Sequence, residues 1–493
     1  MKHPYAPALA ALLFALPAVF RAPAANPAAA PPVTAEKILM QAASPSDLRA
    51  RLLQNAVQAA ATRPADAGES YYYRGLSFER GGIADSAIAS YRRALALRGA
   101  DEDRLALVDI LTRRRDPGSL SEAVALLEET RPRVATDNQI MLVAYNARLA
   151  WALTLAGHAD SSEALTRPYE RELTGRADWR FRMARAAVGT GDDVRAFRLL
   201  LPLAVASREQ DEEVMKLLRE IAERMRTSSR LDGELMRDIG RRDAIEMEAL
   251  APMKGRRISF LGRDGFRLGG VYALPEGKPP FRAAIVIVAS GDTIADYDSL
   301  GVALTGAGYA PLFLDPRGWG WSLSPACPSP DTWAGREDQL GRLVARDVRS
   351  ALTELAARIP VDTLHYVVGG VGSMAAIAVE AADTDHRVGA LLLISPRPAP
   401  VERGAMRERL ARLQIPTFYQ VGPEDRRDEA ITDAFYQAGN RPFSRIADAR
   451  LVGSGARQYR HDPAVRQRLI RWLDETLPRG GRRSPPPSGP RRG

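Results

Sequence analysis

The sequence predicts a two-domain protein, with an all-helical N-terminal half and a C-terminal half that alternates strands and helices. The chain has 493 residues, which is enough for two to three domains. In the first half, glycines recur at intervals of 34 to 39 residues, and apolar residues follow each of them at helical spacing. In the second half, short continuous apolar runs alternate with amphipathic stretches, a pattern typical of a parallel sheet with helices on both faces.

The first residues have the features of a secretory signal. Lys2 precedes an apolar run over residues 8–20, and the sequence Ala22-Pro23-Ala24 offers a small-x-small cleavage site. The run is short for a bilayer span, which takes about 20 residues. We therefore expect residues 1–24 to be a signal peptide for export to the periplasm or beyond, and residues 25–64 to be a linker and a first helix. An uncleaved anchor and a disordered leader are the alternatives.

The charge is basic, but part of the excess is local. The chain carries 69 basic and 60 acidic residues, a net charge of +9, and five arginines without any acidic residue lie in the last 15 positions. No basic stripe interleaved with aromatic residues occurs elsewhere, which argues against nucleic-acid binding. Residues 479–493 are rich in Pro, Gly and Ser, so we expect a disordered tail. The functional alternative is that this tail makes a weak contact with an anionic surface.

No cofactor or metal site is predicted. The single cysteine, Cys327, excludes thiolate-clustered metal sites, and the five histidines have no ligand-like spacing. The glycines around Gly370 follow a predicted strand, but they lack the acidic residue that a dinucleotide-binding fold places further along.

The helical half contains four candidate repeats. The predicted turn glycines are followed five residues later by a small residue, and the pairs are Gly82 and Ala87, Gly118 and Ala123, Gly157 and Ser162, and Gly191 and Ala196. A bulky residue follows each small one at Tyr91, Leu127 and Leu200, whereas Thr166 makes the third repeat degenerate. Small residues let two helices approach closely, and Tyr91 is expected to fill the space beside Gly75.

This arrangement resembles the tetratricopeptide repeat. The resemblance implies an all-α, tetratricopeptide-like solenoid over residues 65–205, with residues 206–254 as a helical linker. A protein or peptide partner is expected in its groove; the alternative is a spacer or scaffold that packs on the next domain.

Residues 255–478 are predicted to form the strand–helix domain. A hairpin turn at Asp264-Gly265 separates two opening strands. Further strands are expected at residues 283–289, 310–314, 364–368, 388–394, 416–421 and 449–452, and the clearest helices at 339–357, 375–382 and 464–477. Ligands of such sheets bind at the carboxyl ends of the strands.

Three features of this half resemble the α/β-hydrolase family. They are the opening hairpin, the Asp315-Pro316-Arg317-Gly318-Trp319-Gly320-Trp321-Ser322 loop, and Gly422-Pro423-Glu424-Asp425 after a late strand. The resemblance covers about 220 residues and implies an α/β-hydrolase fold, with a Ser–His–Asp triad if the domain is active.

The family's nucleophile is a serine in the turn GxSxG. Val371-Gly372-Ser373-Met374-Ala375 places Ser373 there, although neither outer position is glycine. A register shifted by one residue, from Gly370 to Met374, places Gly372 at the nucleophile position and leaves no nucleophile.

The other triad positions are less complete. Asp425 follows its strand at the family's distance and would orient the histidine, with Glu424 and Asp428 as competitors. The family's histidine position is taken by Ala456, and the nearest alternative base is His461. A serine without a base is a poor nucleophile.

The loop that would stabilise an oxyanion also departs from the family. Ser290-Gly291-Asp292 stands where His-Gly is usual, so only the backbone N–H groups near Gly291 and Met374 are expected to serve. Ser290, Asp292 and Trp319 are the expected pocket residues.

Two functions therefore stay open. The first is an exported serine hydrolase of a small ester or amide that uses Ser373, His461 and Asp425. The second is a catalytically degenerate hydrolase domain that acts as a binding or scaffold module. The position of His461 relative to Ser373 discriminates between them.

Overall fold

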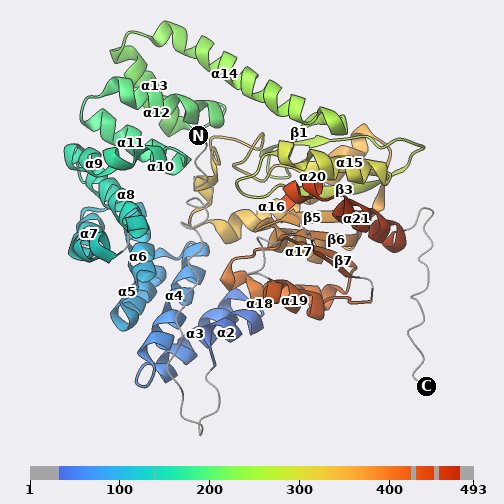
Figure 1. Ribbon diagram of the computed structural model, residues 1–493, viewed down its shortest axis with the longest axis horizontal. Helices are drawn as coiled ribbons and strands as arrows, with labels where there is room; N and C mark the ends of the chain where they lie inside the picture. The colour runs from blue at the N-terminus through green and yellow to red at the C-terminus, as the bar shows by residue number, and fades with distance from the viewer. Residues whose placement is uncertain (1–32, 138, 423–428, 443, 449–454, 478–493) are drawn as a thin grey trace.

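The computed structural model describes residues 33–137, 139–422, 429–442, 444–448 and 455–477 (Figure 1). These residues form a run of helices, here called the helical arm, and a sheet with its covering helices, here called the sheet domain. The expected signal peptide, residues 1–24, and the expected tail, residues 479–493, lie outside the described residues. The same holds for Asp425 and for the strand expected at 449–452.

The helical arm begins at residue 35 and ends at residue 249. Its elements are α2 (Ala35–Gln41), α3 (Pro45–Ala59), α4 (Pro64–Arg80), α5 (Ala84–Arg98), α6 (Asp101–Arg114), α7 (Pro117–Asp137), α8 (Gln139–Leu155), α9 (Ala159–Thr166), η1 (Arg167–Tyr169), α10 (Glu170–Leu173), α11 (Ala177–Gly189), α12 (Asp193–Ala206), α13 (Glu212–Arg224) and α14 (Ser228–Ala249). In Figure 1 the arm curves along one side of the sheet domain, with α4, α6, α8 and α11 nearer the sheet than α5, α7 and α9.

Glycine turns join several of these helices where the sequence predicts them. Gly82, Gly157 and Gly191 all adopt left-handed φ values, +76°, +90° and +78°, between consecutive helices. Gly118 does not: it lies in the first turn of α7, after Pro117, so the predicted turn there is wrong. Pro117 is tolerated there because the first N–H groups of a helix have no intrahelical partner.

Helices α4 and α5 pack closely because Gly75 has no side chain. A Cβ built on Gly75 in α4 would lie 2.6 Å from the ring of Tyr91 in α5, and Tyr91 is completely buried. Tyr91 therefore fills the space beside Gly75, as predicted. The tetratricopeptide-like character of the arm as a whole stays a prediction.

The sheet has eight strands: β1 (Arg256–Leu261), β2 (Arg267–Tyr272), β3 (Phe281–Ile287), β4 (Tyr309–Leu314), β5 (Val361–Val371), β6 (Val388–Ile394), β7 (Thr417–Val421) and β8 (Arg445–Asp448). Their order is β1-β2-β4-β3-β5-β6-β7-β8. Strand β2 runs antiparallel to both neighbours, and the pairings from β4 to β8 are all parallel. The predicted, mostly parallel sheet is confirmed.

Helices cover both faces, because buried strands send alternate side chains to opposite sides. On β3, Ile285 and Ile287 join one core, whereas Ala284 and Val286 join the other. The first core packs against α16 (Glu337–Arg358), α17 (Met374–Asp383), α18 (Arg403–Leu413) and α19 (Glu429–Ala438). The second packs against α15 (Asp298–Gly306), α20 (Gln458–His461) and α21 (Pro463–Thr476).

Polar contacts fasten the arm to the sheet domain at two places. At the end of α4, Arg80 pairs with Glu402 at 2.5 Å and with Asp338 at 3.5 Å. At the other end of the arm, Arg208 donates to the carbonyl of Gly320, and Trp321 Nε1 donates to Asp243 Oδ1 at 3.3 Å. Asp243 lies on α14, so the loop after β4 is held against the arm.

Across the described part of the chain, every helix is too short or too polar to span a lipid bilayer.

Candidate functional site

The turn from β5 into α17 decides which residue occupies the nucleophile position. Gly372 has a φ of +61°, whereas Ser373 is already in the right-handed helical region and caps α17. The strained, left-handed corner of a strand–turn–helix elbow is where the family's nucleophile stands. The observed register is therefore Gly370-Val371-Gly372-Ser373-Met374, with Gly372 at the corner.

Gly370 explains why this register is adopted. A Cβ on Gly370 would lie 2.4 Å from the carbonyl oxygen of Met374 and 2.8 Å from Cβ of Ala378. The end of the strand thus runs directly against the first turn of the helix, and no larger residue fits there.

Ser373 is displaced from the predicted role. It lies one residue beyond the corner, its side chain is exposed, and it makes no hydrogen bond with a described residue. The glycine-rich run therefore folds in the shifted register that the sequence also allows, with Ser373 one residue past the corner. The backbone N–H that follows the corner accordingly belongs to Ser373, not to Met374 as predicted.

The predicted base is also out of place. Ala456, at the family's histidine position, is fully buried among apolar side chains. His461 is the last residue of α20; its side chain is exposed and forms no hydrogen bond with Ser373. The loop therefore does not fold inward to bring His461 to the serine.

A pair of amides joins the two loops that would carry acid and base. Gln420, near the end of β7, donates through Nε2 to Gln458 Oε1 and, at 3.4 Å, to the carbonyl of Gly455. Both glutamine side chains are buried. Sequence reasoning missed this pair, because neither glutamine lies in a motif. A neutral amide pair holds the loops together but moves no proton at neutral pH.

Asp292 lies at the meeting point of three loops. A Cβ on Gly455 would be 3.7 Å from Asp292 Oδ2 and 3.4 Å from Cγ1 of Val371. The loops after β3, β5 and β8 therefore come together, as expected for the carboxyl end of a parallel sheet. Ser290 and Gly291 are exposed beside it, and Gly291 has a φ of +88°.

The surroundings of Asp292 favour its neutral form. Burial, together with the nearby carboxylate of Asp296, raises the pKa of Asp292. Tyr297 donates its hydroxyl to Asp292 Oδ2 at 3.1 Å and accepts from the N–H of Ala289 at 2.8 Å. Arg457, beside Ala456, pairs with Asp296 at 3.0 Å and lies 3.8 Å from Asp292.

Trp319, an expected pocket residue, is buried in the core of the sheet domain. It is 9% exposed and packs edge-on against Trp333, with the ring centroids 5.2 Å apart. Cys327 is buried in the same core, and burial raises the pKa of its thiol. The aromatic residues of this loop therefore pack on the sheet domain, which is the structural alternative to substrate stacking.

Among the residues described, no cluster of three or more His, Cys, Asp or Glu side chains is arranged to hold a metal ion.

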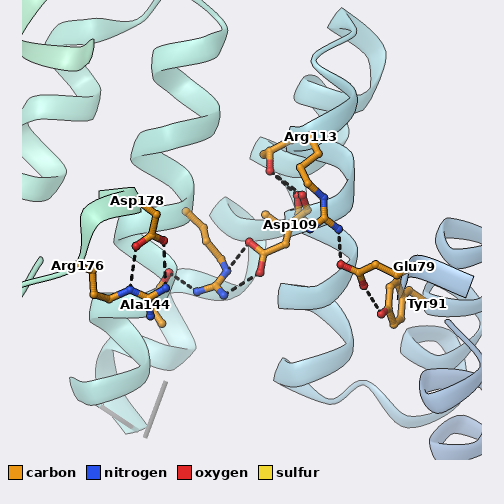
Figure 2. Close-up of polar contacts among 10 residues, drawn as sticks. Glu79, Tyr91, Asp109, Arg113, Ala144, Arg176 and Asp178 are labelled. Carbon is orange, nitrogen blue, oxygen red and sulfur yellow. Dashed lines mark hydrogen bonds and ion pairs between the residues drawn. The ribbon is translucent and has the colours of Figure 1, made fainter. Parts of the chain in front are cut away.

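A second polar surface lies on the inner helices of the arm, and Figure 2 shows it. Arg113 donates to Glu79, which in turn accepts from the hydroxyl of Tyr91 at 2.5 Å. Arg148 forms two hydrogen bonds of 2.8 Å with Asp109. A third pair joins Arg176 to Asp178. We call these three charge pairs the inner strip: Glu79, Asp109, Arg113, Arg148, Arg176 and Asp178.

The inner strip crosses α4, α6, α8 and the start of α11. Its last pair joins Arg176 to Asp178 at 3.0 and 3.1 Å. Arg148 and Asp109 keep 16% and 35% of their side chains exposed, so this pair is only partly accessible to solvent. The signal for these residues in the sequence is weak, because isolated charges on helices usually mark a solvated face.

No protein-family model and no curated protein sequence matches the chain. Solved structures resemble part of it. The esterase domain of a Rhodothermus marinus protein is 17% identical, with 45% of this chain and 98% of that chain covered and a TM-score of 0.34. A predicted hydrolase from Thermoplasma acidophilum is 16% identical, with 44% and 98% covered and a TM-score of 0.35. An acylaminoacyl peptidase from Pyrococcus horikoshii is 14% identical, with 45% and 42% covered and a TM-score of 0.36. Likenesses of this size leave the chemistry to be judged from the residues of this chain.

Proposed function

We propose that the sheet domain is an α/β-hydrolase-fold domain without serine-dependent hydrolysis, and that it serves with the helical arm as a binding or scaffold module. The observation that carries the proposal is Gly372 at the corner after β5. Glycine has no atom that attacks a carbonyl, so covalent catalysis at this position is excluded by chemistry.

The remaining positions point the same way. His461 is exposed at the end of α20, and Ala456 fills the usual histidine site. Ser290-Gly291-Asp292 stands where the family's oxyanion loop has His-Gly, so this loop departs from the family's pattern as well. The altered nucleophile, base and oxyanion loop thus favour a domain that keeps the fold and has lost the reaction.

The competing function is an exported serine hydrolase of small esters or amides. One observation favours it: Ser373 is exposed at the start of α17, where the helix N-terminus stabilises negative charge. For this function His461 would have to approach Ser373 by movement of its loop.

Labelling with a fluorophosphonate tests the proposal. The purified protein, Ser373→Ala and His461→Ala would be treated alongside an active serine esterase as a positive control. We expect no labelling of any of the three proteins while circular dichroism shows them folded. Labelling of the unsubstituted protein that is lost in Ser373→Ala and reduced in His461→Ala would establish the serine hydrolase instead.

The arm is the proposed partner-binding part. Its support is the tetratricopeptide-like spacing of Gly82, Gly157 and Gly191 and the polar inner strip, which stays partly accessible to solvent. Export is a separate proposal, supported only by the apolar run at residues 8–20. N-terminal sequencing of the protein recovered after expression tests it: a chain beginning at about residue 25 supports cleavage, and a chain beginning at Met1 contradicts it.

A further inference from the structure

The charges of the inner strip are matched in pairs. Glu79 is neutralised by Arg113, Asp109 by Arg148, and Asp178 by Arg176. Each arginine of the strip therefore has its own carboxylate, and each carboxylate its own arginine. Because each matched pair is electrically neutral, it adds little net attraction for a charged partner.

Arg182 breaks this pattern. It lies on α11, one turn beyond Asp178, and its guanidinium stacks 4.1 Å from the ring centroid of Trp179 and 5.4 Å from that of Trp151. Among the described residues it forms no ion pair within 4 Å and no hydrogen bond. Its side chain is half-buried.

Its surroundings leave the cation poorly compensated. Burial lowers the pKa of Arg182, and the nearby Arg148 lowers it further. Asp178 and Asp109 raise the pKa of Arg182, but each of them already forms an ion pair with another arginine. The indole faces fix the plane of the guanidinium and leave its nitrogens without an acceptor, so the group is ordered in advance for a planar anion.

We propose that Arg182, held on Trp179 and Trp151, binds a carboxylate side chain of an acidic polypeptide segment that lies along the inner strip. The inference rests on the proposed binding role of the arm and names the chemistry of the partner. A guanidinium fork matches a carboxylate through two parallel hydrogen bonds.

The neighbouring charges favour a carboxylate over a phosphate. Asp109, Asp178 and the exposed Asp331 of the sheet domain all interact electrostatically with Arg182. A phosphate with nearly two negative charges meets more repulsion from these three carboxylates than a carboxylate with one charge.

The polypeptide, rather than a small acid, follows from the extent of the surface. The inner strip crosses four helices, from α4 to the start of α11, a length that an extended segment follows and a small acid does not. Arg182 would then supply the one strong charge contact at one end of that surface.

The experiment measures binding of a fluorescein-labelled hexaglutamate peptide to the full chain by fluorescence anisotropy. A hexaglutamine peptide with the same dye controls for the dye and the backbone. The variants are Arg182→Gln, Arg182→Lys and Arg185→Gln. Arg185 is the matched control, because it lies one turn further along α11 and already pairs with Glu213 at 3.2 Å.

We expect the unsubstituted protein to prefer hexaglutamate, Arg182→Gln to weaken that binding at least tenfold, and Arg182→Lys to weaken it less. Arg185→Gln should stay within twofold, and thermal unfolding should show all variants folded. Equal loss in Arg182→Gln and Arg185→Gln would show only diffuse attraction to a basic protein and would overturn the inference. Unchanged binding in Arg182→Gln, or no binding by the folded protein, would overturn it as well.

Failure here and failure of the proposed function are separable. Fluorophosphonate labelling of Ser373 together with Arg182-dependent peptide binding would remove the non-hydrolytic assignment and keep this inference. If no labelling occurred and Arg182→Gln bound hexaglutamate as well as the unsubstituted protein, the non-hydrolytic assignment would stand and this inference would fail.

Discussion

Arg317 and Asp347 form a buried, two-pronged ion pair in the sheet domain. Nε and one terminal nitrogen of Arg317 each lie 2.7 Å from a different oxygen of Asp347, and the two side chains are 4% and 2% exposed. Arg317 belongs to the loop after β4, and Asp347 to α16. The loop that the sequence associates with a substrate pocket is thus tied into the core on one side and to the arm, through Gly320 and Trp321, on the other.

Removal of Asp347 should destabilise the protein strongly. Asp347→Ala leaves Arg317 buried with only Asp264 as a partner, and an uncompensated buried charge costs about 3 kcal/mol. Urea unfolding followed by tryptophan fluorescence measures the change. Asp264→Ala is the matched control: its side chain is 42% exposed, so we expect a loss of about 1 kcal/mol or less. Equal losses in the two variants would contradict the assigned burial.

A methyl group at Gly75 should loosen the arm. The added Cβ would lie 2.6 Å from the ring of Tyr91, and overpacking of this kind costs about 2 kcal/mol. Thermal unfolding by far-ultraviolet circular dichroism measures it. Gly233→Ala in α14 is the control, because no atom lies within 4 Å of its new Cβ and alanine favours helices by about 1 kcal/mol. If Gly75→Ala proved as stable as Gly233→Ala, α4 and α5 would not be packed through this contact.

Much of the sheet domain could be predicted, because its strands are buried on both faces and appear as apolar runs. Residues 388–394 were expected as a strand, and β6 has the same bounds. Strand β5 begins at Val361, before its apolar part, because its first residues pair with β3 through the backbone rather than through buried side chains. Backbone pairing leaves no mark in the hydrophobic pattern.

The site was harder to predict, because its register depends on how closely the end of β5 packs against the start of α17, and the hydrophobic pattern does not record that distance. The sequence Val371-Gly372-Ser373-Met374 can place either Ser373 or Gly372 at the corner. The close approach of Gly370 to Met374 and Ala378 selects the one in which Ser373 is displaced. The sequence also does not show that Arg182 lacks an ion-pair partner among the described residues. Its neighbours Trp151 and Asp109 come from other helices, so they are known only from the structure.

Stability should fall between about pH 4 and pH 7 because of Asp315. Burial raises the pKa of Asp315 from 3.8 to about 7. Between these two values the folded protein keeps a proton that the unfolded chain has lost, so a rise in pH favours unfolding. The contribution is fully present below about pH 4 and lost above about pH 7, and it amounts to at most about 4 kcal/mol.

The measurement is urea unfolding from pH 4 to pH 8 for the unsubstituted protein and Asp315→Asn. Asparagine cannot ionise and still accepts from the N–H of Trp321, which lies 2.9 Å from the Asp315 carboxylate. We expect a shallower fall in stability with pH for Asp315→Asn and an unchanged profile for Asp232→Asn, at an exposed position of α14. Parallel profiles for all three proteins would contradict a neutral Asp315 at low pH.

Replacement of Gly372 by serine should restore the nucleophile position without restoring hydrolysis. The corner has room, since Cβ of Ala289, 3.8 Å away, is the one described atom within 4 Å of a new Cβ. A left-handed serine costs about 1 kcal/mol of backbone strain, which a domain of this size tolerates. The new hydroxyl would still lack a base, because Ala456 fills the histidine site and His461 is exposed. We therefore expect Gly372→Ser to cleave p-nitrophenyl acetate within twofold of the unsubstituted protein and to resist fluorophosphonate labelling. If Gly372→Ser were labelled, and labelling were lost on adding His461→Ala, the loop that carries His461 would reach the corner after all. The site would then be one substitution away from a hydrolase, rather than degenerate at several positions.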